Sequence, residues 1–469
     1  MEPLVVEYED INMRLISPFV DLRLKISGEL FFKRMIEKKT VIMKRLVNGA
    51  AEKKRFERWI RHKEVTPVRL IATEKLRVKE LVKNRHILAI QDTTEINYQA
   101  NDGRAHGLGV VGNGKDIGFF MHPMLALDAG TGSVIGCSEI ELWNRTKKAD
   151  ENHAKLPIEE KESYRWITTA IGARKVLSEA ECVTFIGDRE SDIYEFLDRI
   201  PDENTHLIAR VCRDRIIENS TCRKLYKHLD QTEEAGRIRI EIARDIRKGR
   251  KKREALLSIK HSMIEIVKPK KCTDKSAPKS IKLYVVEAKE LDCPDGQEPV
   301  HWRLFTTHVV SDFSEAKQII LWYRMRWTIE QVFRTVKSQG LNVEESQIEL
   351  GENLMKLAVL ALCAAIQIMQ LISARDGSTE LKTNDLFTAD ERQFMAALLV
   401  KVEGKTQKQQ NPHPKENLAW ASWVIARLGG WHCYTKSEGP PGPIVMGRGL
   451  KRFYEMFDGW NLYRDLSTG

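Results

Sequence analysis

Hydrophobic and polar residues follow three different patterns along the chain. Residues 1–85 are charged and carry apolar residues at helical spacing inside a Lys/Arg-rich stretch, residues 33–61. From residue 86 short apolar runs of strand length take over, and helical spacing returns after residue 311. The patterns predict a helical N-terminal region that binds DNA (1–85), an α/β core (86–350) and a helical C-terminal domain (351–469).

Apolar runs that end in an acid predict the central strands of the core. HILAIQD (86–92) and VTFIGD (183–188) have this form, and THLIARV (205–211) is a further strand. Residues 119–127 and 132–142 are predicted strands separated by the turn sequence DAGTG. Helices are expected over 158–178 and from about Ser191. Strands followed by helices favour a mixed sheet.

Residues 212–310 are predicted to form a β-rich insertion in this core. Alternating apolar and polar residues occur in RIRIEIA, LLSIKHSMIEIV and IKLYVVEA, and WRLFTTHVV (302–310) is the expected exit strand. The basic run RKGRKKR connects the first two segments. We expect its cations to contact DNA phosphates, although a merely solvated hairpin tip is the alternative. These cations are Lys248, Arg250, Lys251, Lys252 and Arg253.

The part after the insertion is predicted to be mostly helical. Asp312 and Glu315 form a capping signal for a long helix that continues to about Ser338. Further helices are expected at 353–374, 389–402, 416–427 and 449–458. The apolar run at 357–366 is too short for a membrane span, so a buried helix and no membrane contact are predicted.

Composition narrows the class of partner. The 469 residues contain 76 Lys and Arg against 66 Asp and Glu, and the resulting net charge of +10 favours a polyanionic partner. Eight scattered cysteines include no C-x-x-C pair, which argues against a zinc site and for reduced thiols in a cytoplasmic protein. The acidic start MEPLVVEYED lacks the pattern of a signal peptide.

One predicted helix carries a polar stripe. At about 100° per residue, five side chains fall within roughly 80° of one another, with apolar residues opposite. They are Tyr323, Arg326, Glu330, Arg334 and Lys337. Such a stripe is also typical of a salt-bridged surface helix. One acid among several cations equally suits a metal ligand beside phosphate-binding groups.

Three carboxylates form the candidate metal site. Asp92 and Asp188 each end an apolar strand, where open α/β sheets bind ligands, and Glu330 lies on the striped helix. A lone aspartate at a strand end is usually a turn or cap residue, but three acids together can hold two Mg²⁺ or Mn²⁺ ions. Three nearby acids are left outside the site: Asp128, Glu190 and Asp192.

The motifs resemble those of one known family. The spacing Tyr323-x2-Arg326-x3-Glu330-x6-Lys337 resembles the Y-R-E-K signature of DDE transposases of the insertion-sequence-4 type. QDTTEINY (91–98), IGDRESDIYEF (186–196), HWRLFTT (301–307) and ARLGGW (426–431) resemble further family segments in the same order. The likeness spans roughly residues 56–460, whereas the first 50 residues match only loosely.

The resemblance implies a fold and a reaction. It implies an RNase H-like catalytic core with a β insertion, and dimerisation through the C-terminal domain. It also implies cut-and-paste transposition at a two-metal site formed by Asp92, Asp188 and Glu330. Water nicks one strand, the new 3′-hydroxyl forms a hairpin, and the reopened end joins target DNA. Tyr323, Arg326 and Lys337 would hold phosphates, and Trp302 would stack on a flipped base.

The implied partners are double-stranded DNA at transposon terminal inverted repeats and target DNA. The protein is expected as a homodimer in the DNA complex, on the nucleoid of a prokaryotic cytoplasm. Two alternatives stay open at this stage. The same acids would serve a metal-dependent endonuclease that does not join strands, and a non-catalytic DNA-binding inhibitor of transposition would share the basic surface.

Overall fold

The computed structural model describes residues 19–145, 156–219, 222–242, 252–338 and 340–467. Three of the basic residues predicted to contact DNA, Lys248, Arg250 and Lys251, lie outside these ranges. The remaining predicted site residues lie within them.

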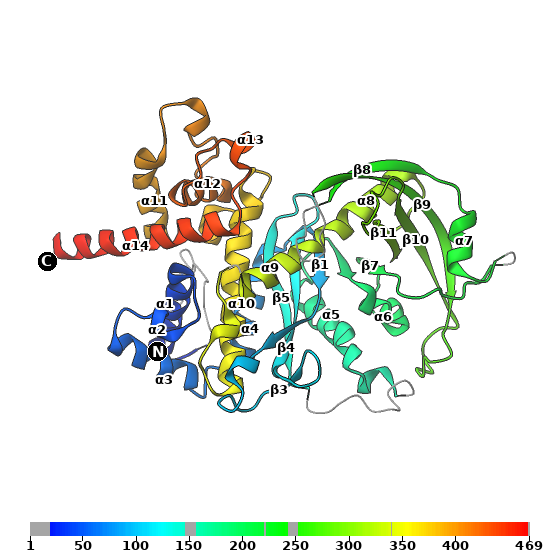
Figure 1. Ribbon diagram of the computed structural model, residues 1–469, viewed down its shortest axis with the longest axis horizontal. Helices are drawn as coiled ribbons and strands as arrows, with labels where there is room; N and C mark the ends of the chain where they lie inside the picture. The colour runs from blue at the N-terminus through cyan, green and yellow to red at the C-terminus, as the bar shows by residue number, and fades with distance from the viewer. Residues whose placement is uncertain (1–18, 146–155, 220–221, 243–251, 339, 468–469) are drawn as a thin grey trace, which may run out of the picture.

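One mixed sheet organises the described chain (Figure 1). Its order is β2-β4-β1-β6-β7-β11-β10-β9-β8, and β3 and β5 pair with β4. β1, β6 and β7 are parallel, and antiparallel strands flank them on both sides. The strands are β1 His86–Gln91, β2 Thr94–Asn97, β3 Gly109–Val111, β4 Asp116–Asp128, β5 Val134–Trp143, β6 Cys182–Gly187, β7 Thr205–Arg210, β8 Gly236–Ile242, β9 Arg253–Val267, β10 Ser280–Glu290 and β11 His301–Thr306.

Helices cover both faces of the parallel strands. They are α1 Leu22–Lys38, α2 Met43–Leu46, α3 Ala50–Arg61, α4 Pro67–Leu81, α5 Arg165–Val176, α6 Tyr194–Arg199, α7 Leu225–Gln231, α8 Phe313–Met325, α9 Trp327–Lys337, α10 Gly351–Ala374, α11 Ala389–Val402, α12 Leu418–Leu428, α13 Thr435–Glu438 and α14 Pro443–Ser467. Ile87 and Ala89 pack with α5 and α6, whereas Leu88 and Ile90 belong to the cluster that includes α8, α9 and α10. This alternation follows from the strand period of two. The predicted mixed α/β fold with helical flanks is confirmed.

The insertion extends the central sheet. β11 returns to pair with β7, with Phe305 opposite Ala209, and β10, β9 and β8 follow outward. The described part of the insertion is rich in strand, as predicted, and also contains α7. Because β11 leads directly into α8, the insertion ends beside the striped helix.

The predicted helix over 312–338 is divided into α8 and α9. At the junction the Arg326 amide donates to the Tyr323 carbonyl at 3.1 Å, and the Ile329 amide donates to the Arg326 carbonyl at 3.2 Å. These three-residue hydrogen bonds tighten the helix locally, so α8 ends at Met325 and α9 begins at Trp327. Periodicity does not reveal such a break, because the residues on both sides keep helical spacing.

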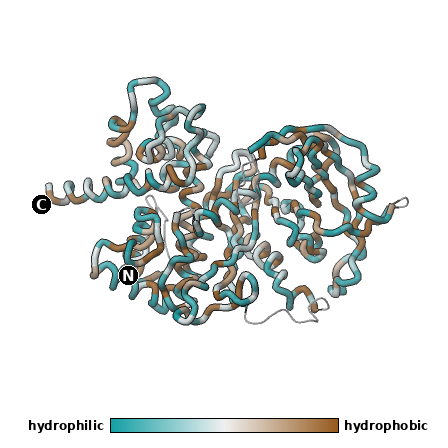
Figure 2. Tube along the Cα trace, in the orientation of Figure 1, coloured by the Kyte–Doolittle hydropathy of each residue, from teal (hydrophilic) through white to brown (hydrophobic). Residues whose placement is uncertain are grey.

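α10 is the central element of the helical half, as Figure 1 shows. By length and composition it could cross a membrane, but 94% of its most apolar window is buried inside the protein. The predicted buried helix is thus confirmed. α14 is longer than the predicted 449–458 and extends away from the body, with hydrophilic and hydrophobic residues intermixed along it (Figure 2).

Candidate active site

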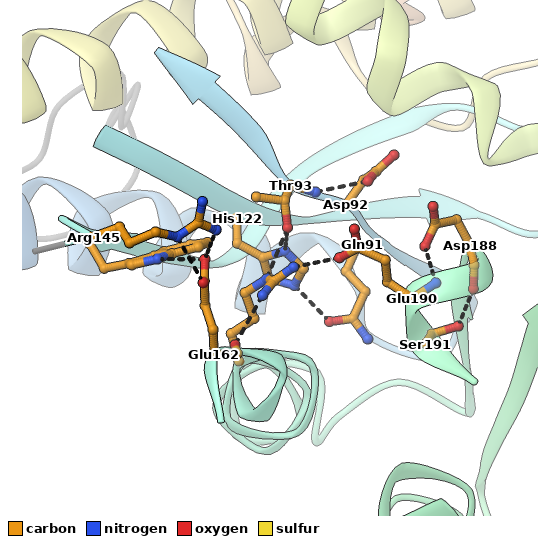
Figure 3. A network of polar contacts seen from close by, with 11 residues as sticks. Gln91, Asp92, Thr93, His122, Arg145, Glu162, Asp188, Glu190 and Ser191 are labelled. Atoms are coloured by element: carbon orange, nitrogen blue, oxygen red, sulfur yellow. Dashed lines mark hydrogen bonds and ion pairs between the residues drawn. The ribbon is translucent and has the colours of Figure 1, made fainter. Parts of the chain in front are cut away.

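Two acids stand side by side at the ends of neighbouring parallel strands. β1 and β6 pair as far as Ile90 opposite Ile186, so Asp92 and Asp188 follow two residues later in the same register. Because side chains alternate along a strand, they lie on the same face as Ile90 and Ile186, which belong to the cluster that includes α8–α10. Figure 3 shows both side chains extending from these adjacent strand ends.

Backbone amides orient both carboxylates. The Thr93 amide donates to Asp92 Oδ1 at 2.8 Å, and the Glu190 amide donates to Asp188 Oδ1 at 2.8 Å. Each of these bonds comes from the turn that follows the strand. One oxygen of each acid is therefore fixed, and Oδ2 remains for other partners.

Arg326 links one strand acid, Asp92, to the helix acid Glu330. Its guanidinium donates to Asp92 Oδ2 at 2.8 Å and to Glu330 Oε1 at 2.7 Å. Arg326 lies at the α8–α9 junction and Glu330 is one turn later on α9, so helical spacing places both side chains on the same side. The structure thus places Asp92 and Glu330 around one cation.

The electrostatics favour positive charge at this place. Burial raises the pKa of Asp92 to about 6; Arg326 opposes that shift, and the neighbouring charges of Asp188 and Glu330 add to it. Burial disfavours the charge on Arg326, but Tyr323, Asp92 and Glu330 outweigh it and raise the Arg326 pKa. The charges of Asp188 and Glu330 therefore act on Asp92, and Arg326 contacts two of the three acids.

The donor set suits a hard divalent cation, although it is not arranged for one. Among the described residues, no three His, Cys, Asp or Glu side chains are grouped so that they could hold a metal ion. Arg326 stands between Asp92 and Glu330 and holds the oxygens that a cation would use. The chemistry therefore fits Mg²⁺ or Mn²⁺ once that guanidinium moves.

A cleft of about 1100 Å³ lies beside Arg326, which contacts Asp92 and Glu330, although none of the three acids lines the cleft. Trp302, Tyr323 and Arg326 line it, and the Trp302 and Tyr323 rings meet edge to face with centroids 5.5 Å apart. Tyr323 is only 4% exposed, whereas Trp302 is partly exposed. The aromatic pair therefore presents mainly Trp302 to the cleft.

Arg210 is a cleft residue that sequence reasoning missed. It ends β7, and Gly187 pairs with Ala209, so Arg210 stands in register with Asp188. It lines the cleft and interacts with Tyr323. A sequence signal for Arg210 was available, because it is the charged residue near the end of THLIARV (205–211), a third apolar strand after those that end in Asp92 and Asp188.

The rest of the stripe is engaged within the protein. Lys337 pairs with Glu344 at 3.2 Å, and Arg334 lies over the Trp327 ring at 5.5 Å. Both side chains are partly exposed. An exposed ion pair contributes little free energy, so Lys337 can exchange Glu344 for another partner.

The two described residues of the basic tip differ sharply. Arg253 forms a buried ion pair with Glu290, which is fully buried, so its charge stabilises the β9–β10 pair. Lys252 is 67% exposed and pairs with Glu241 at 3.3 Å. The expectation that Arg253 contacts phosphate therefore conflicts with its position inside the sheet, whereas Lys252 keeps an accessible charge.

The basic N-terminal stretch is partly tied to α14. Lys33 and Arg34 both pair with Asp458. Exposed cations elsewhere in the stretch are Lys44, Arg45, Lys54, Arg55, Arg58 and Arg61. The described N-terminal helices thus offer both an internal contact and a basic surface.

A comparison with known protein families bears on this geometry. Residues 168–366 match the family model described as the transposase DDE domain. The match includes Asp188 and Glu330 and begins after Asp92. Together with the mixed sheet and helical flanks, it agrees with the expected RNase H-like fold. The match supports a transposase of the DDE type, which acts on DNA and belongs to a class that generally uses divalent metal ions.

Proposed function

We propose that this protein is a cut-and-paste transposase that nicks DNA, forms and opens a hairpin, and joins the freed end to target DNA. The observation that carries the proposal is the meeting of three acids from separate parts of the chain. Asp92 and Asp188 stand in register on β1 and β6, and Arg326 connects Asp92 to Glu330 on α9.

In this proposal Asp92, Asp188 and Glu330 hold two Mg²⁺ or Mn²⁺ ions. When bound, the ions would activate water or a 3′-hydroxyl and stabilise the leaving oxygen. The protein residues would keep the acids on one face of the sheet and exclude bulk water through α9. Arg326 would transfer its hydrogen bonds from the carboxylates to a DNA phosphate, to which a guanidinium binds equally well.

The phosphates of the transposon end would lie along the cleft. Arg326, Tyr323 and Arg210 line it directly. Lys337 and Arg334 would contact phosphates farther along α9, after exchanging weak internal partners. Lys252 and the exposed cations of α2 and α3 would add contacts that do not depend on DNA sequence.

Trp302 would receive the base that leaves the stack when the hairpin closes. A hairpin forces a tight turn on the strand, and unstacking a base costs a few kcal/mol. An indole at the cleft can offset about 1–3 kcal/mol by stacking. The partly exposed ring of Trp302 against Tyr323 supports this role.

Two protein copies would bring two DNA ends together. α14 exposes Leu462, Tyr463 and Leu466 at its far end, where they are 61%, 73% and 74% accessible. Apolar residues gathered on a protruding helix are typical of a partner contact. We place this dimer on nucleoid DNA in a prokaryotic cytoplasm.

The decisive experiment incubates the full chain and Mg²⁺ with a duplex that carries the terminal repeats flanking its gene. Hairpin ends and joined products are expected, and Asp188→Ala should form neither. Cleaved ends that never form hairpins or join would identify an endonuclease instead. Binding without cleavage would identify a non-catalytic DNA-binding protein.

A further inference from the structure

Arg165, the first residue of α5, contacts the turns that follow both strand acids. Its Nε donates to Thr93 Oγ1 at 3.0 Å, and a terminal nitrogen donates to the Glu190 carboxylate at 2.5 Å. The remaining terminal nitrogen donates to the Glu162 carbonyl at 3.0 Å. The guanidinium is 10% exposed and lies over the Trp143 ring. It is therefore held on several sides.

The two residues that Arg165 holds are those whose amides orient the acids. Thr93 donates its amide to Asp92 Oδ1, and Glu190 donates its amide to Asp188 Oδ1. One rigid guanidinium thus reaches the side chains of both orienting residues. A planar fork can fix two groups at a constant separation, which a flexible ammonium cannot do.

A buried histidine completes the support behind Thr93 (Figure 3). His122 Nε2 lies 3.1 Å from Gln91 Oε1, and His122 Nδ1 lies 2.9 Å from Thr93 Oγ1. With the Gln91 oxygen able only to accept, Nε2 carries the proton and Nδ1 accepts from the Thr93 hydroxyl. The Thr93 oxygen is then free to accept from Arg165. The side chain of Thr93 therefore has a fixed direction.

We propose that Arg165 is a positioning residue that sets the separation of Asp92 and Asp188, and so the affinity of the site for divalent cations. The inference rests on the proposed metal site and adds a residue that neither touches DNA nor binds the metal. Supporting hydrogen bonds around metal ligands commonly change metal affinity by about 10- to 100-fold.

The test measures metal affinity directly. Mn²⁺ bound by the full chain with a terminal-repeat duplex is followed by electron paramagnetic resonance, and the Mg²⁺ midpoint for cleavage is recorded in parallel. Arg165→Gln should weaken Mn²⁺ binding and raise the Mg²⁺ midpoint by about 10-fold or more, while DNA affinity stays near wild type. Thr93→Val and Glu190→Gln should give smaller shifts, and Thr93→Ser should behave as wild type.

Coupling between these variants separates positioning from general destabilisation. Arg165→Gln combined with Thr93→Val should weaken Mn²⁺ binding by less than the sum of the two single changes, because both remove the Arg165–Thr93 contact, whereas Thr93→Val also removes the contact with His122. The matched control is Arg199→Gln. Arg199 also pairs with two carboxylates, Glu159 and Asp274, but contacts neither orienting turn. Arg199→Gln should lower the melting temperature without moving the Mg²⁺ midpoint for cleavage.

The outcomes distinguish the inference from the function it rests on. If the wild type binds no more Mn²⁺ than Asp188→Ala, the proposed metal site fails. If the wild type exceeds Asp188→Ala but Arg165→Gln, Thr93→Val and Glu190→Gln all match the wild type, Arg165 is structural only. Equal midpoint shifts in Arg165→Gln and Arg199→Gln would also overturn the positioning role.

Discussion

The two ends of strands β1, β6 and β7 carry opposite chemistry on the same face of the sheet. At the carboxyl ends, Asp92, Asp188 and Arg210 form a row of charges. At the other end His206 is the β7 partner of Thr184, and His86 on β1 contacts the Thr184 hydroxyl. The first row gathers charged side chains, whereas burial favours the neutral form of the histidines in the second.

The neutral end is a partly buried cluster of rings. Thr184 Oγ1 lies 2.8 Å from His86 Nε2 and 2.7 Å from His308 Nε2, and the His206 and His308 rings stack at 4.0 Å. Trp322 of α8 lies against His86 and His308. Burial lowers the pKa of all three histidines, that of His308 to about 3, and the neighbouring histidines add to the shift for His86 and His308.

The contrast shows how one helix pair serves both ends. Trp322 fixes α8 to the neutral rings, and one turn later Arg326 and then Glu330 meet the charged row. The packing of Trp322 against uncharged rings therefore sets the position of α8, and with it the position from which Arg326 contacts Asp92. Changes at the charged end should alter chemistry, and changes at the neutral end should alter stability.

The largest expected effect comes from deleting the charges. Asp92→Ala, Asp188→Ala and Glu330→Ala should each reduce cleavage to background while DNA binding survives, because two ions cannot be placed by two acids alone. A gel assay for nicked strands and a binding assay on the same duplex measure this. Near-normal cutting by one variant would remove that residue from the site.

A substitution of Arg326 tests whether its guanidinium occupies the position that a metal ion would take between Asp92 and Glu330. Arg326→Gln should slow cleavage by about 10- to 150-fold, since a charge-assisted contact contributes ~1.5–3 kcal/mol. The same variant should bind Mn²⁺ more tightly than wild type without DNA, because Asp92 and Glu330 lose their internal partner. Arg199→Gln, which loses ion pairs with Glu159 and Asp274 and is placed in neither the metal site nor the DNA surface, is the control. Unchanged Mn²⁺ binding in Arg326→Gln would contradict this position of the guanidinium.

Trp302 tests the cleft beside the charged end. Trp302→Ala should nick the first strand normally and form hairpins about 10- to 100-fold more slowly, the kinetic equivalent of ~1–3 kcal/mol. An abasic nucleotide at the flipped position should restore part of the rate. If both steps fall together with the melting temperature, Trp302 serves mainly as packing for β11.

The histidine cluster at the neutral end should make the stability of the protein depend on pH. A histidine whose folded pKa is lowered binds fewer protons folded than unfolded, so stability falls as pH drops below about 6.5 and toward the folded pKa. His308 should cost about 1–2 kcal/mol between pH 7 and pH 5. His308→Asn should flatten the melting temperature over that range, whereas exposed His432→Asn should not. Parallel curves for His308→Asn and wild type would disprove the assignment.

The smallest effect concerns the basic tip, away from both ends. Lys252→Ala should reduce the slope of log K against log salt by about 1, as one lost phosphate contact does. Arg253→Ala should leave the slope unchanged and lower the melting temperature, because Glu290 would lose its buried partner. A smaller salt slope in Arg253→Ala, with an unchanged slope in Lys252→Ala, would make Arg253 the phosphate contact instead.

The parts of this site that depend on local pattern could be predicted from sequence. Asp92 and Asp188 were visible as acids after apolar runs, and Glu330 as the acid of a polar stripe, because strand and helix periods are local properties. The pairing of Arg253 with Glu290 and the reach of Arg165 to Thr93 and Glu190 were not visible. Those contacts depend on how distant segments align in the sheet, which no window of residues contains.

The burial of α10 has a consequence for how the protein is made. α10 packs against α1, α3 and α4 from the start of the chain, against β5 of the sheet, and against α12 and α14 near the end. A ribosome reaches it only after the N-terminal helices and most of the sheet have emerged. The early helices must therefore wait with an apolar face uncovered until residues 351–374 arrive. Premature termination before residue 351 should leave that face open to chaperones and proteases.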